Sequence, residues 1–417
     1  MHELQKLKEN DIFAVTDGEG NITVTSSAGE GLYFRDTRFL SFYQIEIEDC
    51  HLEMLSSSGE LNFMSTLQLT NDRFTLPNGT AVPPRTLSIH RNRFLDRGLH
   101  ERIGIFNYNP FPVTLTLRVS FGSDFRDMFD VRNVHRPPVR GWPAEPECEE
   151  STIRLRYTGL DGLVRTTRVD FDRKPDEIRI DNDVLLNGQT AESEEDGIAA
   201  DPRTEQVAPF PSVDAVFQAM VPARAPWSLT LDVVPSIGAD TKELQPTLDA
   251  SFARVLEAHE DWQAACTNIW TDHAQLNALI QRSLHDLRLA INDEPTGLMP
   301  MAGIPWFSVP FGRDSLITGL QTLCLNPNIA AGALRFLARY QGQTVDPWRD
   351  EEPGKILHEM RSGELATLKE VPHTPYYASI DATPLFIWSL AELLHWTGDW
   401  GLVASLRPNL ELALDWM

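Results

Sequence analysis

The chain has 417 residues, of which 42% are hydrophobic and 9% aromatic, enough apolar material for more than one core. Its 60 acidic and 36 basic residues give a formal net charge of −24. A surface of that sign repels nucleic-acid phosphates and anionic membranes, so we expect neither nucleic acid nor a membrane as a partner.

The cysteines are scattered, and no two form a Cys-x-x-Cys pair, which predicts neither a zinc site nor a disulfide framework. They are Cys50, Cys148, Cys266 and Cys324. The N-terminus is polar and lacks the apolar stretch of a signal peptide. No run of about 18 or more apolar residues is present. We expect a cytoplasmic protein.

Apolar and polar residues alternate up to about residue 240, as is typical of half-buried strands. The clearest runs are 43–47, 113–121, 153–157 and 227–233. Many short strands without intervening helices predict an antiparallel β-sandwich. We interpret the acidic stretch 192–197 as a solvated loop and the segment 35–41 as a charged turn.

From about residue 247 the spacing of apolar residues becomes helical. A helix is predicted over 272–292, with its apolar residues on one face. Further helices are predicted over 314–324, 328–340, from Thr383 onward and over 409–417. Thr383 is the expected N-cap and Pro384 the first helical residue. That helix is apolar nearly all round, so we expect it to be well buried. Alternating helices with large loops at one end predict part of an α/α-barrel.

The loop 302–312 is rich in proline and aromatic residues and delivers Arg313 and Asp314 to the start of a helix. A guanidinium fork beside a carboxylate can bind sugar hydroxyls, which both donate and accept hydrogen bonds. Trp306 offers a flat apolar face for a pyranose ring. The structural alternative is an aspartate at a helix start with an arginine partner.

The loop 345–377 carries polar groups too densely for a simple connector, and loops of this length are functional or disordered. These groups are His358, Glu359, Arg361 and Glu364. A solvated surface loop is the alternative. One His beside one Glu is poor evidence for a metal site. Asp381 stands just before a predicted helix, at the same kind of position as Asp314. We expect it to line the same pocket; the alternative is that its carboxylate only accepts hydrogen bonds from loop amides.

Four segments together resemble the bacterial amylo-α-1,6-glucosidase or glycogen-debranching-type family. They are the stretches DTRFLS at 36–41, GIPWFSVPFGRDS at 303–315, PGKILHEMRSGE at 353–364 and YYASIDATPLFIW at 376–388. The resemblance implies an N-terminal β-sandwich over 1–240, a linker helix over 241–271 and, over 272–417, the first part of an (α/α)6 toroid of the six-hairpin glycosidase type. The toroid is expected to be incomplete.

The resemblance also implies inverting hydrolysis of α-linked glucose without a cofactor or metal. Arg313 and Asp314 match the pair that grips the terminal glucose, and Asp381 matches an acidic residue of the same pocket. His358, Glu359 and Arg361 match a loop on the substrate side. The catalytic acid and base are expected beyond Met417, which leaves Asp314, Asp381 and Glu359 as the local candidates.

The leading hypothesis is therefore an amylo-α-1,6-glucosidase that acts on limit dextrin in glycogen debranching. A hydrolase of a small α-glucoside or glucosyl osmolyte and a non-catalytic glucan-binding protein are the alternatives. The partner is a glucan or small glucoside, and the sequence indicates no oligomeric state.

Overall fold

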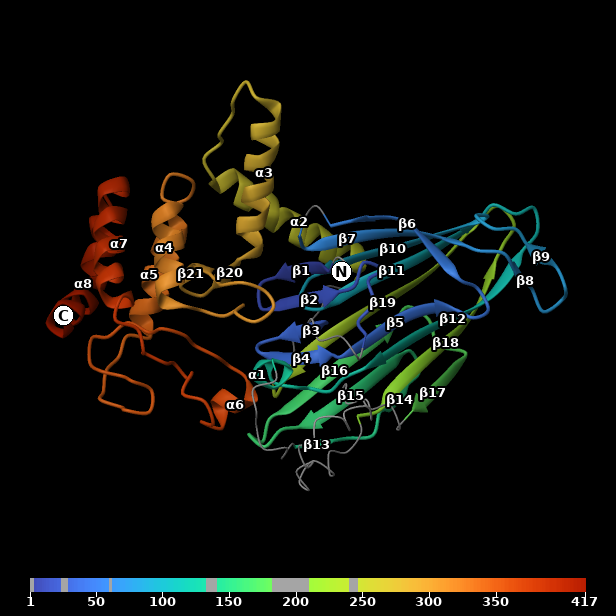
Figure 1. The fold of residues 1–417 in the computed structure, drawn as a ribbon, viewed down its shortest axis with the longest axis horizontal. Helices are drawn as coiled ribbons and strands as arrows, with labels where there is room; N and C mark the ends of the chain where they lie inside the picture. The colour runs from blue at the N-terminus through green and yellow to red at the C-terminus, as the bar shows by residue number, and fades with distance from the viewer. Residues whose placement is uncertain (1–3, 24–28, 60–61, 133–140, 182–209, 240–246) are drawn as a thin grey trace, which may run out of the picture. The chain divides into compact units, whose positions relative to one another are not determined.

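The structure, a computed structural model, describes residues 4–23, 29–59, 62–132, 141–181, 210–239 and 247–417 (Figure 1). The chain forms two compact units, one of residues 1–8 and 12–252, the other of residues 9–11 and 253–417. The division falls inside a helix, α2 (Leu248–Ala265), that begins in the expected linker. The acidic stretch 192–197 lies outside the described residues.

A nine-stranded antiparallel sheet is the largest element of the first unit. Along the sheet the order is β13-β15-β16-β19-β11-β10-β7-β6, with β14 paired to β15. These strands are β6 (Leu52–Ser58), β7 (Met64–Asn71), β10 (Leu87–Leu95), β11 (Leu99–Asn107), β13 (Trp142–Pro143), β14 (Glu147–Glu149), β15 (Thr152–Thr158), β16 (Val164–Phe171) and β19 (Pro226–Ile237).

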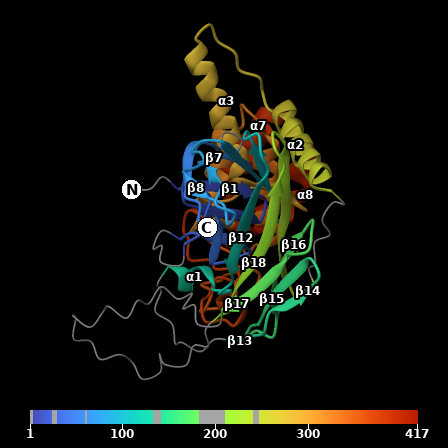
Figure 2. The same ribbon diagram turned by 90° about the vertical axis from the view of Figure 1, so that its right-hand side faces the viewer.

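A second antiparallel sheet, ordered β17-β18-β12-β5, shares its core with the first. Its strands are β5 (Phe42–Ile47), β12 (Val113–Gly122), β17 (Glu177–Asp181) and β18 (Ser212–Val221). Figures 1 and 2 show β12 beside β18 in both views. Alternate residues, such as Leu115, Leu117 and Val119, point into this core. The predicted antiparallel β-sandwich is confirmed.

A four-stranded sheet, ordered β1-β2-β3-β4, completes the first unit with the short pair β8–β9 and the single turn α1. These elements are β1 (Gln5–Glu9), β2 (Ile12–Thr16), β3 (Gly31–Phe34), β4 (Thr37–Leu40), β8 (Phe74–Thr75), β9 (Ala81–Val82) and α1 (Met128–Val131). The turn between β3 and β4 holds Arg35 and Asp36, both with positive φ. Arg38 follows, and its guanidinium grips the Asp124 carboxylate with both Nε and Nη2.

Helices make up most of the second unit. Besides the larger part of α2, they are α3 (Ala274–Leu289), α4 (Gly312–Gln321), α5 (Asn328–Arg339), α6 (Glu364–Thr367), α7 (Ala382–Thr397) and α8 (Trp400–Trp416), with one hairpin of β20 (Ile291–Glu294) and β21 (Gly297–Pro300). Figure 1 shows α4 and α7 side by side. The close packing of α4 on α5 depends on Gly319, because a Cβ there would stand 3.0 Å from Ala330 Cα.

Two expectations about α7 are wrong. The N-cap is Asp381, two residues before the expected cap, and Thr383 Oγ1 instead accepts a hydrogen bond from Ile356 N at 3.0 Å. The helix is also not buried all round, because Trp388 and Trp396 are 56% and 58% exposed. These two positions are eight residues apart and therefore share one face. The last helix, α8, begins nine residues earlier than the apolar pattern indicated.

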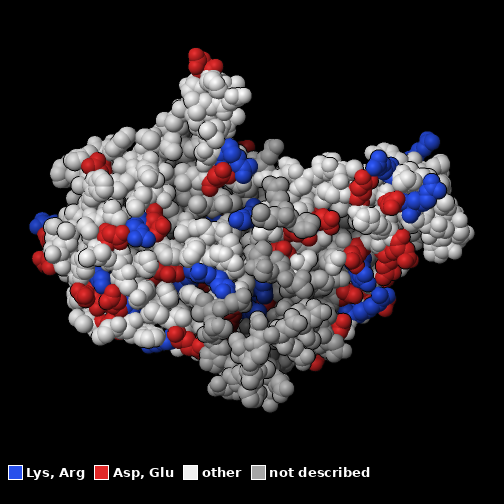
Figure 3. Space-filling model, in the orientation of Figure 1, with Lys and Arg blue, Asp and Glu red and all other residues white. Residues whose placement is uncertain are grey.

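Charged side chains of both signs are interspersed over the face seen in Figure 3. None of the described helices combines the length and hydropathy needed to cross a bilayer.

The buried pair Arg38–Asp124 gives a first prediction. The two side chains are 10% and 0% exposed, so Arg38→Met leaves a buried carboxylate with Arg126 Nε at 3.5 Å. We expect the free energy of unfolding of the first unit to fall by about 3–5 kcal/mol, measured as the urea transition in far-UV circular dichroism.

The matched control is Arg85→Met, which breaks the exposed pair of Arg85 and Glu53. There we expect a change of less than about 1 kcal/mol. Equal urea midpoints for the two variants would show that the buried pair contributes no more to stability than the exposed pair.

Candidate functional site

A short irregular segment, residues 357–361, connects several of the predicted site residues. His358 O accepts a hydrogen bond from Gly312 N at 2.9 Å, and His358 N donates to Tyr376 O at 2.7 Å. Position 312 must be glycine, because a Cβ there would stand 2.0 Å from Leu357 O. This contact brings the first turn of α4 directly against the segment.

The start of α4 also meets the start of α7. Arg313 Nη1 donates to Asp381 Oδ2 at 3.1 Å, and Ser379 Oγ donates to Asp381 Oδ1 at 2.5 Å. The side chains of Arg313 and Asp381 are 47% and 40% exposed, so a ligand can reach both. Burial raises the pKa of Asp381, but the hydrogen bonds from Ser379 and Arg313 outweigh it and hold that pKa below its ordinary value. Asp381 is therefore ionised at neutral pH.

Glu359 has a different environment, because its carboxylate is buried and bound on both oxygens. Arg361 Nε donates to Oε1 at 2.6 Å, and His373 Nε2 lies 3.5 Å from Oε2. Arg361 Nη2 in turn donates to Trp306 O at 2.9 Å. Glu359 thus holds Arg361 in place, and Arg361 fixes the loop that carries Trp306.

The imidazole of His358 is enclosed by aromatic rings. Its centroid lies 5.6 Å from that of Phe311 and 6.2 Å from that of Tyr376, both roughly perpendicular to it. Its Nδ1 atom is buried and has no hydrogen-bond partner among the described residues. Most buried polar atoms in folded proteins have a hydrogen-bond partner, so this nitrogen is an exception within the predicted site.

Asp314 lies in the first turn of α4 and is exposed. Six of the seven predicted residues are thus linked to one another near the first turns of α4 and α7. The links are direct side-chain contacts and backbone hydrogen bonds. These six are Trp306, Arg313, His358, Glu359, Arg361 and Asp381. Asp314 is adjacent to Arg313 in the chain.

The sequence did not point to Ser379, His373 or Gly312. A signal for Ser379 existed, because a serine two residues before an aspartate in a loop can bond its carboxylate. For His373 there was no such signal, because it reaches Glu359 only after the loop between residues 359 and 373 has folded.

Among the described residues, no three His, Cys, Asp or Glu side chains gather in a way that could hold a metal ion. All four cysteines are free thiols.

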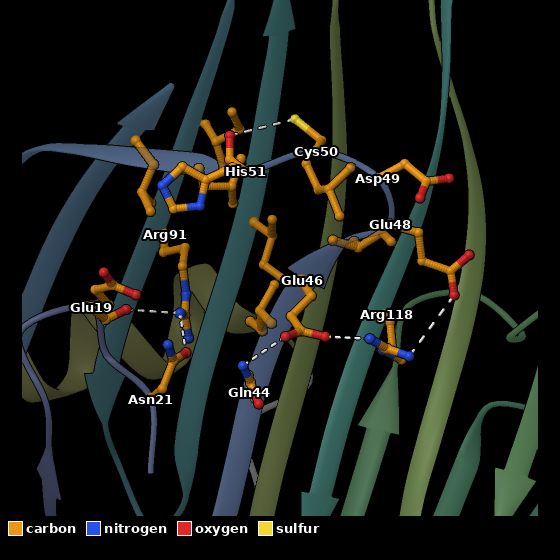
Figure 4. Close-up of a pocket in the computed structure, with 17 residues that line it drawn as sticks. Glu19, Asn21, Gln44, Glu46, Glu48, Asp49, Cys50, His51, Arg91 and Arg118 are labelled. Carbon is orange, nitrogen blue, oxygen red and sulfur yellow. Dashed lines mark hydrogen bonds and ion pairs between the residues drawn. The ribbon is translucent and has the colours of Figure 1, made fainter. Parts of the chain in front are cut away.

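A cavity of about 520 Å³ lies in the first unit, between the edge strand β5 and the large sheet (Figure 4). None of the predicted site residues lines it. Both arginines that line it are paired with carboxylates: Arg118 contacts Glu46, and Arg91 binds Glu101 at 2.6 Å. The predicted site residues all lie in the loops and helices of the second unit instead.

A protein-family model described as the N-terminal domain of some glycogen debranching enzymes matches residues 7–232. No curated protein matches the sequence.

Among solved structures, one assigned as a kojibiose phosphorylase from the human microbiome matches with a TM-score of 0.56 and 11% identity. The match covers 95% of this chain and 54% of that chain, so this chain spans about half of its length. It extends across both units, and the predicted fold class, a β-sandwich followed by the first part of an (α/α)6 toroid, is confirmed.

A 4-α-glucanotransferase from Thermococcus litoralis matches with a TM-score of 0.30 and 8% identity, over 56% of this chain and 39% of that chain. A galactose mutarotase related enzyme from Lactobacillus acidophilus also has a TM-score of 0.30, with 9% identity over 58% of this chain and all of that one. Scores of this size do not establish a common fold for the whole chain.

The lowered pKa of Asp381 gives a second prediction. We expect Arg313→Gln to raise it, because the guanidinium favours the ionised carboxylate. Since the folded-state pKa lies below the ordinary value of about 4, the stabilising contact is present above that value and is lost as the pH falls through the folded-state pKa. Carboxyl ¹³C NMR titration measures the shift, with Asp381→Asn assigning the resonance.

Arg407→Gln is the control, because it breaks an exposed pair with Glu411 on α8 and should leave Asp381 unchanged. If Asp381 titrates at its ordinary pKa in the wild type, Arg313 does not govern its ionisation.

Proposed function

Because this chain belongs to the family that carries the N-terminal domain of glycogen debranching enzymes, we propose that its second unit binds the terminal glucose of an α-glucan for hydrolysis. The Arg313–Asp381 pair carries this proposal. A guanidinium and an ionised carboxylate offer donors and acceptors side by side, which is what a sugar hydroxyl requires.

The positions of the two residues support a role in binding rather than in helix stability. Arg313 lies in the first turn of α4, where the helix dipole disfavours a cation. Asp381 is the N-cap of α7, yet its side chain makes no capping hydrogen bond and instead binds Arg313 and Ser379. Asp381 therefore does not supply the cap that its place would ordinarily provide, and Arg313 stands where a cation does not stabilise the helix.

Within this proposal, Asp314, Asp381 and Glu359 have binding or positioning roles. Inverting hydrolysis needs a protonated carboxyl as acid and a carboxylate as base, about 6.5–9.5 Å apart. The lowered pKa of Asp381 is unsuited to the acid, and Glu359 is occupied by Arg361 and His373. We therefore assign neither the acid nor the base to these three carboxylates.

We propose α-1,6-linked glucose in limit dextrin as the substrate, within the cytoplasm. The binding residues alone are equally compatible with a small α-glucoside. A protein that binds glucan without cleaving it is the candidate from another class, and the occupied state of Glu359 is the observation that favours it.

The binding proposal predicts that Arg313→Gln and Asp381→Asn each weaken maltose binding. Each change removes a charge-assisted hydrogen bond, so we expect Kd to rise about 10- to 100-fold, measured by isothermal titration calorimetry. Asp415→Asn, an exposed carboxylate on α8, should leave Kd unchanged. Wild-type affinity in both site variants would remove the pair from the site.

The hydrolysis proposal predicts release of glucose, first as the β-anomer, from limit dextrin without added phosphate. Proton NMR identifies the anomer. We expect activity only in a protein that contains both the acid and the base. Production of glucose 1-phosphate that depends on inorganic phosphate would instead establish phosphorolysis, and binding without turnover would favour the glucan-binding candidate.

A further inference from the structure

The loop over residues 345–351 holds an exposed tryptophan in a braced turn. Trp348 is 54% exposed, and its backbone N donates to Asp346 Oδ1 at 3.0 Å. Asp346 and Glu351 also pair through two backbone hydrogen bonds of 3.0 Å each. The turn therefore closes on itself and carries the indole outward.

Arg349 fastens this turn to the predicted site. Its Nε donates to Asp346 Oδ2 at 3.0 Å, and its guanidinium contacts the buried carboxylate of Glu351. Its backbone O accepts a hydrogen bond from Tyr377 N at 2.9 Å. Tyr377 is buried and lies four residues before Asp381, so the turn is attached to the segment that leads to Asp381.

Other apolar side chains around this attachment are exposed as well. Val345 precedes the turn, and Ile380 stands directly before Asp381; both are largely exposed. Exposed apolar residues near polar ones are typical of a ligand-binding surface. Ile380 adjoins Asp381 in the chain, and the turn is linked to the segment before Asp381 by the hydrogen bond between Tyr377 N and Arg349 O.

The charges of the turn indicate which ligand would suit this surface. Arg349 is paired with two carboxylates, Asp346 and Glu351, and Lys355 Nζ binds the Asp350 carboxylate at 3.0 Å. Because these cations are paired with carboxylates, the turn presents no free positive charge to an anion. The indole is a flat apolar face of the kind that packs against the C–H face of a neutral pyranose ring.

We infer that Trp348 is a stacking platform for a glucose unit further along an α-glucan, beyond the terminal glucose held by Arg313 and Asp381. This inference rests on the proposed function. On this inference, the turn over 345–351 makes the protein bind a chain of several glucose units more tightly than a single glucoside. The turn fixes the backbone of Trp348 before the ligand arrives, which reduces the conformational entropy that is lost when the sugar binds.

The experiment compares two ligands with the 417-residue chain. Methyl α-glucoside fills only the terminal glucose position, whereas maltopentaose also reaches the platform. We expect Trp348→Ala to raise the Kd for maltopentaose about 3- to 10-fold and to leave the Kd for methyl α-glucoside unchanged. Trp348→Phe should retain part of the affinity, and maltopentaose should change tryptophan fluorescence in the wild type but less in Trp348→Ala.

Trp400→Ala is the matched control. Trp400 is also exposed, but it begins α8 after the whole of α7, about 24 Å of helix beyond Asp381. Its replacement should alter neither Kd. Thermal melting of each variant confirms that it is folded.

The outcomes separate the two proposals. If Arg313→Gln abolishes binding of both ligands while Trp348→Ala changes neither Kd, the platform is refuted and the glucose-binding proposal stands. Equal loss of both ligands in Trp348→Ala also overturns the platform, because the residue then acts at the terminal glucose or on the fold. If the wild type binds neither ligand, both proposals fail together.

Discussion

The backbone pairing of residues 357–361 is the constraint on which the candidate site depends. This segment lies between two others, bonded to Pro310 and Gly312 on one side and to Tyr376 on the other. The segment adds a backbone support to the direct packing of α4 on α7. The glycine at 312 is part of the same constraint, because any side chain there would collide with the backbone of the segment.

Two carboxylates on this scaffold are held in opposite ways. Glu359 is buried and bound by Arg361 and His373, so it acts on the positions of its neighbours. Asp381 is only partly buried and shares one oxygen with Arg313 and the other with Ser379. A carboxylate with four lone-pair sites and two partners can still accept further hydrogen bonds. The geometry therefore favours recognition of hydroxyl groups at Asp381 and structural support at Glu359.

Local patterns predicted the local structure well. Alternation located β5, β12, β15 and β19, and helical spacing located α3, α4 and α5 to within a few residues. The predicted burial of α7 failed because composition does not tell which neighbours a helix has, and one face carrying Trp388 and Trp396 is open. The predicted N-cap was wrong because the hydroxyl of Thr383 accepts a hydrogen bond from Ile356 N, a tertiary contact.

The candidate site could be predicted only in part, because its residues meet through long-range contacts. Arg313 and Asp381 are 68 residues apart, and the interpretation of both as site residues came from their placement before helices. Their direct contact, and the bonding of Arg361 to Trp306 O across 55 residues, depend on how the loops fold over one another. Spacing along the chain carries no information on such pairs.

Two Arg–Asp pairs of this chain differ in how far they are buried. Arg38–Asp124 is nearly inaccessible, and its charges satisfy each other inside the first unit. Such a pair contributes mainly by avoiding an unpaired buried charge. Arg313–Asp381 is almost half exposed, so it is worth little to stability, as partly solvated ion pairs generally are. A pair that contributes little to folding and sits where the dipole of α4 disfavours its arginine is best explained by what it can bind.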